Sequence, residues 1–545
     1  MDYKAELIKL LQPIINEPFV LETPPSPVMG DFALPCFKLK KKAHELQPLI
    51  KVPKFIKKIE QKGPYLNFFV DETVVGKEIM SEILKKKEKY GSLSIGKGKT
   101  LLVEFSSPNI GKPFGIGHLR STIIGNALAN IAEKAGYKVI RMNYVGDWGT
   151  QFGKLIVGFK RFGNTAALKK NAIDHLLEVY VKVNAQPELE EEGRLWFKKL
   201  EEGNKEAIAL WKEFKERSLA EFKGVYSLLG VDFDVWNGES GYTKAMEEIE
   251  KVLEKKRLIE ESDGAQIIKL EEEGLGVCIV KKTNGTSTYI TRDIAAAIDR
   301  KKKYKFDAMW YEVGIEQTLH FKQLFAILKK IGHDWAENCV HIEHGLYLDK
   351  DGKKFATRKG KTVLVKAILQ EMIDLAKKSI EEKNPKLKEK ENVARQVAVA
   401  ALLFGDLKNN RINDSVFDLE RFLEFEGDTG PYVQYTYARA SSILRKAGKV
   451  QGKMYGDLVE AEGKLVKVLG QYPMIMQIAV QDRAPHHLAQ YALHLAQTFN
   501  AFYRDCPVLD QEMNVTQKRI ALVQATRLVL QNALALLGIE VPEEM

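Results

Sequence analysis

The residue types best suited to nucleotide chemistry lie in a glycine-rich loop early in the chain. Residues 106–117 contain three glycines and two prolines, and they separate an apolar run at 101–105 from a helical pattern at 119–135. Ligands of open α/β sheets bind beyond the carboxyl ends of strands, and a helix N-terminus attracts phosphate. Here Gly117 would let a nucleotide approach the backbone, and His118 would present a ring N–H to a phosphate oxygen. A capping or packing role is the alternative for a single histidine near a helix start.

Two common phosphate-binding loops do not fit this segment. A Walker motif needs Ser or Thr after Gly-Lys, but Pro113 follows Lys112. The dinucleotide fingerprint needs a glycine three residues after Gly117, where Arg120 stands. What remains is a Gly-x-Gly-His sequence, beginning at Gly115, that opens a helix.

A second segment combines five cations within the nine residues 353–361 and follows an expected strand at 341–348. A basic loop at this place would clamp a triphosphate and stabilise charge on the leaving pyrophosphate. Because the turn sequence 349–352 directly precedes it, a solvated turn is the alternative.

The elements that must position these segments follow the order strand, loop, helix, strand. The runs at 101–105, 119–135 and 138–142 predict a parallel α/β sheet with right-handed crossovers. A second series of expected elements comprises the strands 287–291 and 307–313 and the helices 294–300 and 318–331. The highly charged, mostly helical stretch between the two series is interpreted as an insertion that splits a nucleotide-binding fold.

Composition narrows the class of protein. The chain has 545 residues, enough for several domains, and a formal charge of +10 that hints at a polyanionic partner. The four cysteines form no CxxC pair, so neither a disulfide framework nor a zinc site is expected. No apolar run reaches the roughly 18 residues of a membrane span, and the N-terminus carries acids where a targeting peptide would not. A soluble, cytoplasmic protein without a membrane partner is predicted.

Taken together, the two loops resemble the paired signatures of class I aminoacyl-tRNA synthetases, a His-x-Gly-His loop and a Lys-Met-Ser-Lys-Ser loop. Longer segments resemble arginyl-tRNA synthetases in particular, and the resemblance runs from Gly30 to the final helix. These segments are 104–114 (EFSSPNIGKPF), 117–125 (GHLRSTIIG), 146–153 (GDWGTQFG), 289–299 (YITRDIAAAID) and 428–439 (DTGPYVQYTYAR).

Two departures from the family signatures are visible. Gly115 replaces the first histidine of the first signature, and in the second Thr357 stands at the second lysine while Phe355 and Ala356 replace Met and Ser. Family members with altered second signatures rely on a lysine just upstream of the first loop, and Lys112 occupies that place. Arg358 would supply a further fixed cation, although its planar fork differs from a point charge.

The resemblance also implies three domains. Residues 1–95 would be an N-terminal α+β domain that contacts tRNA, and residues 96–370 a Rossmann-like catalytic domain with a helical insertion around 165–262. Residues 371–545 would be an all-α anticodon-binding bundle. The 25 residues 38–62, with nine lysines against two acids, are then a candidate tRNA contact rather than only a solvated face. In the bundle, one or two among Tyr432, Tyr435, Tyr437 and Arg439 are expected to contact RNA, the other tyrosines belonging to the core.

The resemblance further implies a site residue by residue. Asp293 and Tyr289 would face the guanidinium of arginine, and Glu104 would add negative charge. The amino and carboxylate end would be held by Gln317, Asn109 and Ser107 beside His118. ATP would contact Gly115, Gly117, His118, Glu316 and Lys354, while His118, Lys112, Lys354 and Arg358 would stabilise charge developing on the phosphates. From the residues alone, Asp293 is more often a helix N-cap.

The implied reaction is attack by the arginine carboxylate on the α-phosphorus of Mg-ATP, followed by transfer of arginine to the terminal ribose of tRNA. Positioning and phosphate stabilisation would carry catalysis. Arginine, ATP and arginine tRNA are therefore the expected partners of a monomer whose activation step requires tRNA, and no structural metal is expected.

Two alternatives compete with this interpretation. The first is a non-catalytic tRNA-binding paralogue, favoured by the replacements at Gly115, Phe355 and Ala356 but opposed by the retained arginine-binding set. The second is a class I enzyme for cysteine, whose zinc pocket four scattered cysteines cannot supply.

Overall fold

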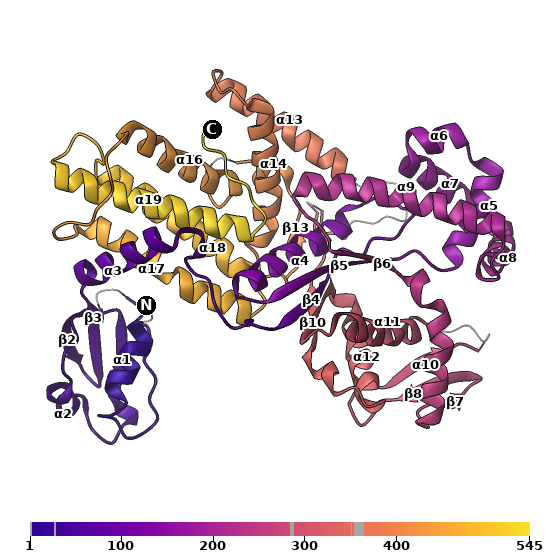
Figure 1. The fold of residues 1–545 in the computed structure, drawn as a ribbon, viewed down its shortest axis with the longest axis horizontal. Helices are drawn as coiled ribbons and strands as arrows, with labels where there is room; N and C mark the ends of the chain where they lie inside the picture. The colour runs from indigo at the N-terminus through magenta and orange to yellow at the C-terminus, as the bar shows by residue number, and fades with distance from the viewer. Residues whose placement is uncertain (1–2, 27–28, 284–287, 350, 354–363, 425) are drawn as a thin grey trace.

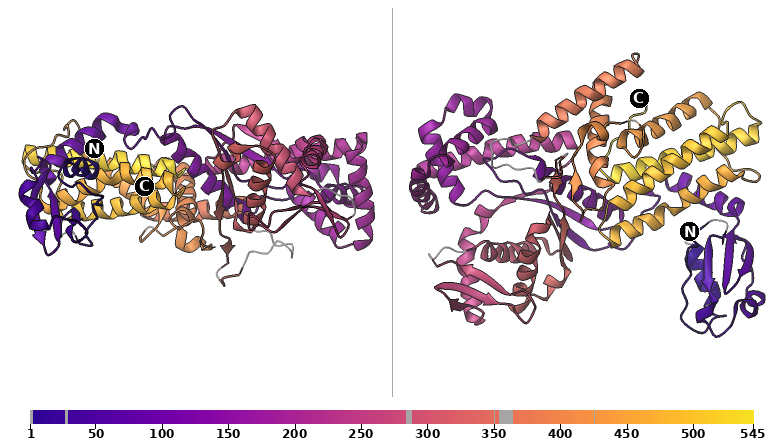
Figure 2. Two further views of the ribbon diagram at one scale, coloured as in Figure 1. Left: turned by 90° about the horizontal axis from the view of Figure 1, so that it is seen from below. Right: turned by 180° about the vertical axis from the view of Figure 1, so that it is seen from behind.

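A computed structural model describes residues 3–26, 29–283, 288–349, 351–353, 364–424 and 426–545. The molecule is elongated, with a small N-terminal unit and a helical bundle at one end and a group of helices, from α5 (Thr150–Phe162) to α8 (Glu190–Glu201), at the other (Figure 1). A five-stranded sheet lies between them. The two further views keep the same order along the long axis (Figure 2).

The central sheet is entirely parallel, as the sequence predicts. Its strands run in the order β11-β10-β4-β5-β6. They are β4 (Thr100–Glu104), β5 (Lys138–Val145), β6 (Val235–Gly238), β10 (Ala308–Gly314) and β11 (Cys339–His344). The chain adds β5 and β6 on one side of β4 and later β10 and β11 on the other, so the strand order reverses between β4 and β10. Ligands of open α/β sheets bind at the carboxyl side of such a reversal.

Helices cover both faces of this sheet. Side chains alternate along β4, so Leu101 and Val103 join the core beneath α4 (Ile116–Lys134), whereas Leu102 joins the core beneath α11 and α12. The second face is formed by α11 (Tyr289–Tyr304) and α12 (Thr318–Lys330).

The strand expected at 287–291 is wrong for residues 288–291, and residue 287 lies outside the described residues. Thr288 is the extended N-cap of α11, with φ −90° and ψ 177°, and Tyr289 is already the first residue of the helix. The short run of β-branched and aromatic residues has strand propensity, but the alanines of Ala295–Ala297 and the burial of Ile290 and Ile294 favour one continuous helix. The nearby strand is instead β9 (Val277–Lys281), in a separate antiparallel sheet with β7 (Glu260–Ser262) and β8 (Ala265–Lys269).

The charged stretch between the two halves of the sheet is largely helical. Its helices are α5 (Thr150–Phe162), α6 (Thr165–Lys170), α7 (Ala172–Asn184), α8 (Glu190–Glu201), α9 (Lys205–Leu229) and α10 (Thr243–Lys255). It also contains β6, which pairs with β5, so part of this stretch belongs to the central sheet.

The N-terminal unit has its own core around a three-stranded antiparallel sheet. Its elements are α1 (Tyr3–Leu11), β1 (Phe32–Pro35), α2 (Ala43–Leu46), β2 (Ile56–Lys62) and β3 (Tyr65–Val70), and α3 (Glu72–Lys86) leads out of it.

The C-terminal part is a helical bundle that holds α3 against itself. Its helices are α13 (Val365–Lys383), α14 (Lys390–Leu407), α15 (Leu419–Phe422), α16 (Gly430–Ala447), α17 (Glu460–Gln481), α18 (His486–Asp505) and α19 (Met513–Leu536). Just after α3, the ring of Tyr90 stacks on that of Tyr472 with centroids 5.8 Å apart. Lys467 of α17 forms ion pairs with Glu72 at 2.7 Å and with Asp31 at 2.9 Å. The two ends of the chain are therefore joined by packing and by charge.

Among the described residues, no helix is long and apolar enough to cross a membrane, and no group of three or more His, Cys, Asp or Glu side chains is arranged to hold a metal ion.

Candidate active site

A cavity of about 470 Å³ opens at the carboxyl ends of β4, β5 and β10, where the strand order reverses. It brings together most of the residues that the sequence nominates for arginine. Its lining includes the nominated Glu104, Ser107, Asn109, Lys112, Tyr289, Asp293 and Gln317, and also Tyr144, Gly146, Gln151, Glu239, Arg300, Tyr311, Val313, His320, Phe321 and Leu324.

The loop after β4 enters this cavity through a strained turn. Ser106 and Ser107 have φ of 73° and 45°, a left-handed conformation that non-glycine residues rarely adopt. Ser106 is fixed by hydroxyl contacts with Thr122 at 2.7 Å and Tyr226 at 2.6 Å. The turn leaves the buried Ser107 Oγ without a hydrogen-bond partner among the described residues. An orphaned hydroxyl in a polar cavity is suited to receive a ligand group.

Asn109 is positioned by the neighbouring strand end. It forms an isolated parallel bridge with Gly146, just after β5. A Cβ at Gly146 would lie 2.1 Å from the Asn109 side-chain oxygen, so only glycine leaves room for this amide. The glycine at the start of the 146–153 segment is therefore needed to make space for the Asn109 side chain.

Tyr289 and Asp293 lie four residues apart on one face of α11, not on two sides of a strand-to-helix junction as expected. Asp293 stands in the second turn, beyond the free N–H groups of the helix start, so the N-cap alternative does not apply. Its carboxylate instead accepts a hydrogen bond from His320 Nε2 at 2.7 Å. Tyr289 is 64% exposed and forms the rim of the cavity.

Glu104 reaches the cavity but is already paired. It shares a strand face with Leu102, beneath α11, and its carboxylate lies 2.6 Å from the Arg300 guanidinium. Arg300 lies seven residues after Asp293, on the same side of the helix, and is 2% exposed. Its guanidinium is also 4.6 Å from the ring of Tyr144. The expected negative charge is thus compensated inside the protein.

Glu239 is a carboxylate that the sequence reasoning missed. It lies in the short helix η6 (Glu239–Tyr242) after β6 and lines the cavity. Burial raises the pKa of Glu239 to about 7, the Arg292 guanidinium at 3.2 Å opposes the rise, and Asp293 and Asp147 add to it. Its position after a strand of the central sheet is the signal that would have found it, but that strand was not predicted.

His118 lies at the third position of α4, beside the cavity rather than in its wall. Burial and the nearby Lys112 lower the pKa of His118 to about 4, so the ring is neutral at pH 7. The helix begins three residues earlier than expected, with Gly115 as N-cap. Apart from the neighbouring residues and backbone of its own helix, no described residue lies within 4 Å of a Cβ added at Gly117, so that flank of the helix start has space for a ligand among the described residues.

The first signature segment contacts the chain just before α13. Gly115 forms an isolated bridge with Leu364, the first described residue after the second basic segment. Lys354, Phe355, Ala356, Thr357 and Arg358 lie outside the described residues. Glu316 is exposed in η7 (Ile315–Gln317) and is not part of the cavity lining, whereas Gln317 is.

The arrangement can bind a cationic amino acid next to a nucleotide. One part of the cavity carries the carboxylates Asp293 and Glu239, which suit a guanidinium or ammonium group. Another part offers amide and hydroxyl groups at the strand ends, beside the open helix start at His118.

Comparison with known proteins decides the family. The family described as "tRNA synthetases class I (R), catalytic domain" matches residues 79–419, "Arginyl tRNA synthetase N terminal domain" matches 3–70, and "DALR anticodon binding domain" matches 433–545. The chain belongs to the arginyl-tRNA synthetase family. Curated members with full coverage of both chains include an arginine–tRNA ligase of Bacillus anthracis, 45% identical, and one of Clostridium perfringens, 46% identical.

Solved structures of arginyl-tRNA synthetases agree. The Thermus thermophilus enzyme is 27% identical, with a TM-score of 0.85 over 100% of this chain and 99% of that one. The Plasmodium falciparum enzyme, at 23% identity and a TM-score of 0.80 over 100% of this chain and 98% of that one, shares the fold. The predicted family and its architecture of α/β catalytic domain, N-terminal α+β domain and C-terminal helical domain are confirmed.

Proposed function

We propose that this chain activates L-arginine with ATP to arginyl-adenylate and pyrophosphate, and then transfers arginine to the 3′-terminal ribose of its tRNA. The observation that carries the proposal is the cavity at the strand-order reversal, where carboxylates and polar amides lie beside an open helix start bearing His118. Membership of the arginyl-tRNA synthetase family supports the same reaction.

The guanidinium of arginine is assigned to the carboxylates of Asp293 and Glu239, with the Tyr289 ring at the rim. A guanidinium has five donors in one plane and needs several acceptors around it. Because Arg300 already neutralises Glu104, Glu104 acts on the substrate less directly than the sequence suggests.

The amino and carboxylate end of arginine is assigned to Asn109, Gln317 and Ser107. They come from the loop after β4 and from the N-cap of α12, on both sides of the reversal point. The amide groups can donate to a carboxylate and accept from an ammonium. This leaves the arginine carboxylate facing the helix start, where the α-phosphate of Mg-ATP would lie.

Phosphate charge is assigned to His118, Lys112 and the second basic segment. A neutral His118 donates one N–H to an oxygen whose charge grows in the transition state. Gly117 gives the nucleotide access, and the bridge of Gly115 to Leu364 supports a place for the second basic segment near the first, because that segment precedes Leu364 in the chain. Lys354 and Arg358 complete the proposed set, with Glu316 as a further ATP contact.

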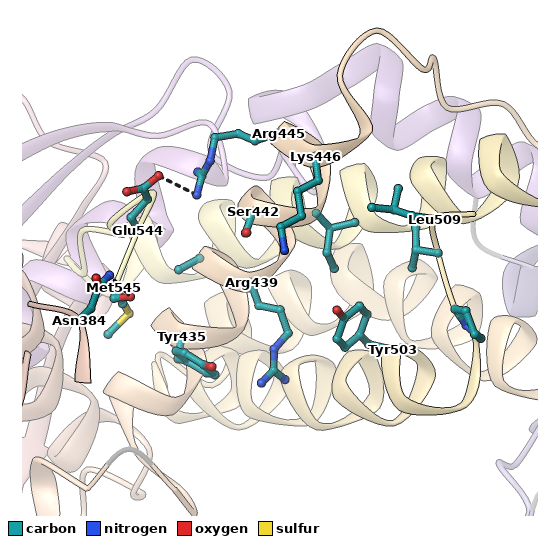
Figure 3. A pocket seen from close by; sticks show the side chains of 14 residues that line it. Asn384, Tyr435, Arg439, Ser442, Arg445, Lys446, Tyr503, Leu509, Glu544 and Met545 are labelled. Atoms are coloured by element: carbon teal, nitrogen blue, oxygen red, sulfur yellow. Dashed lines mark hydrogen bonds and ion pairs between the residues drawn. The ribbon is translucent and has the colours of Figure 1, made fainter. Parts of the chain in front are cut away.

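The tRNA is assigned to the bundle and to the basic N-terminal unit, within the proposed domains 371–545 and 1–95. A second cavity, of about 650 Å³, lies between α16, α18 and the C-terminus. There Arg439 lies between two rings, with its guanidinium carbon 4.8 Å from the centroid of Tyr435 and 5.7 Å from that of Tyr503 (Figure 3). Exposed rings beside a guanidinium suit a splayed base. Tyr437 is buried and Tyr432 is hydrogen-bonded by Asn500, so Tyr435 is the proposed RNA contact among the three predicted tyrosines.

The deciding experiment is aminoacylation of unfractionated tRNA with each of the twenty amino acids in turn. Arginine alone is expected to be incorporated, and incorporation of another amino acid, or of none, contradicts the proposal. ATP–pyrophosphate exchange with arginine, with and without tRNA, separates an enzyme from a binding paralogue. We expect exchange only in the presence of tRNA. The proposed monomeric state is checked by sedimentation, and the proposed cytoplasmic location by fractionation of the source cells.

A further inference from the structure

Asp293 and His320 form a pair that neither the sequence signatures nor the family match singles out. The His320 Nε2 atom lies 2.7 Å from Asp293 Oδ2, and the two side chains come from neighbouring helices, α12 and α11. Both line the cavity, and both are about three-quarters buried. Resting on the function proposed above, we propose that His320 is the positioning residue of Asp293: it holds the carboxylate in the orientation that receives the guanidinium of arginine.

Asp293 needs an external support. It stands in the second turn of α11, where no free backbone N–H can fix its carboxylate. Its electrostatic neighbours include Glu104 and Glu239, which carry the same sign when ionised. Like charges favour a rotamer that turns the carboxylate away. A single well-directed donor is therefore decisive for the position of this group.

His320 is equipped to supply that donor. An ionised carboxylate only accepts hydrogen bonds, so Nε2 carries the proton and donates it. The imidazole packs edge-on against Phe321, with centroids 5.5 Å apart and an interplanar angle of 78°. Phe321 in turn stacks on His341 of β11 at 4.6 Å, and His341 Nε2 lies 3.0 Å from the Val313 carbonyl. The donor is thus tied to the central sheet through packed rings.

The pairing with His320 gives the two oxygens of the Asp293 carboxylate different roles. Oδ2 is occupied by His320, while among the described residues Oδ1 has no hydrogen-bond partner and is left for a ligand. Because its Nε2–H is committed to Asp293, His320 does not itself offer an acceptor to a guanidinium from that nitrogen. Its effect on arginine is therefore indirect, which separates it from the groups that contact the substrate.

The test uses ATP–pyrophosphate exchange by the full chain with tRNA present, first varying arginine at saturating ATP and then varying ATP. Loss of one hydrogen bond to a charged group should raise the arginine KM of His320→Ala about tenfold or more. The rate at saturating arginine and the KM for ATP should stay within about twofold, because only amino-acid binding is weakened. His320→Gln restores an N–H donor and should recover most of the arginine affinity. An arginine KM for His320→Ala within twofold of the parent overturns the proposal, as does a glutamine variant no better than alanine.

Two further variants separate positioning from a general structural effect. Lys322→Met changes an exposed residue of the same helix that does not line the cavity, and its arginine KM should not change. In a variant that already carries Asp293→Ala, adding His320→Ala should raise the arginine KM by less than about twofold. A residue that acts only through Asp293 has no further effect once that carboxylate is gone. If the two substitutions raise the arginine KM by factors that multiply in the double variant, the proposal is contradicted. The proposed function fails separately, if the unaltered chain activates no arginine or prefers another amino acid.

Discussion

Arg300 places its guanidinium 2.6 Å from the Glu104 carboxylate, inside the cavity proposed for arginine. The protein thus keeps an arginine of its own next to the site for its substrate. The pair is almost fully buried, with 2% and 6% of the side chains exposed. The pair neutralises one carboxylate of the cavity. Glu239 is also paired, with Arg292 at 3.2 Å, so Asp293 is the cavity carboxylate that has no arginine partner among the described residues.

Breaking this pair on one side should destabilise the protein. Arg300→Met leaves the Glu104 charge buried and unpaired, which should lower the free energy of unfolding by about 3–5 kcal/mol. The double variant with Glu104→Gln removes both charges and should recover a large part of that loss. Thermal unfolding of the single and double variants measures the difference. As a control, the exposed Lys302→Met on the same helix should change stability by less than about 0.5 kcal/mol. A single variant as stable as the parent would contradict the assignment.

Glu239 should make arginine binding depend on pH near neutrality. Its pKa is raised to about 7, so it is mostly protonated at pH 6 and mostly ionised at pH 8. Because the ionised form attracts a guanidinium, the arginine KM should fall as pH rises through this window, by about three- to tenfold. Exchange assays at fixed ATP and tRNA between pH 6 and pH 8 measure the profile. Glu239→Gln should flatten it, and an unchanged slope in that variant would assign the titration to another group.

His118 should contribute through transition-state stabilisation. His118→Ala should lower the single-turnover rate of adenylate formation by about 10²–10³-fold, the cost of one lost donor to a developing oxyanion. Since its pKa of about 4 keeps the ring neutral, the step should show no loss attributable to His118 protonation between pH 6 and pH 8. Rapid-quench measurements with tRNA present provide the rate. A near-normal rate in the alanine variant would remove His118 from the proposed set.

Two tyrosines of α16 allow a matched test of the RNA contact. Tyr435 is 42% exposed beside Arg439, whereas Tyr437 is 1% exposed and donates to Glu543. Tyr435→Ala should raise the KM for tRNA about 5- to 150-fold, the equivalent of about 1–3 kcal/mol for one stacked base, with the KM values for arginine and ATP unchanged. Tyr437→Ala should instead lower the unfolding temperature, since it opens a core cavity. If both substitutions raise the KM for tRNA equally, the assignment of Tyr435 as an RNA contact and Tyr437 as a core residue is contradicted.

The sequence predicts the sheet and the main loop of the site well, because both depend on local order. The apolar run at 101–105 and the glycines after it indicate a strand followed by a ligand loop without any long-range information. Residues 287–291 mislead for the same reason. Their side chains favour a strand locally, and the helix is selected by the alanines that follow and by the packing of Ile290 and Ile294 against the sheet.

Charge partners cannot be found by local reasoning. Glu104 and Arg300 are far apart in the sequence and meet only because β4 and α11 pack together. Glu239 was missed because the strand before it, β6, was not predicted, and His320 was missed although it follows the nominated Gln317 by three residues. Only the convergence of η6 and α12 on one cavity shows that both belong to the site. A motif identifies the residues of its own loop, whereas the neighbours of those residues are set by the fold.

The packing of α3 on α17 bears on how the protein would recognise the overall shape of a folded RNA. Tyr90 on Tyr472 and Lys467 between Asp31 and Glu72 join the N-terminal unit to the bundle. The two proposed RNA contacts, the lysines of residues 38–62 and Tyr435, are then held at a set distance from each other. The protein would then select an RNA by the distance between two of the RNA's corners, before any base is recognised. Weakening the contact between the N-terminal unit and the bundle, for example by Lys467→Ala, would reduce selection by RNA shape and leave both proposed contact surfaces unchanged.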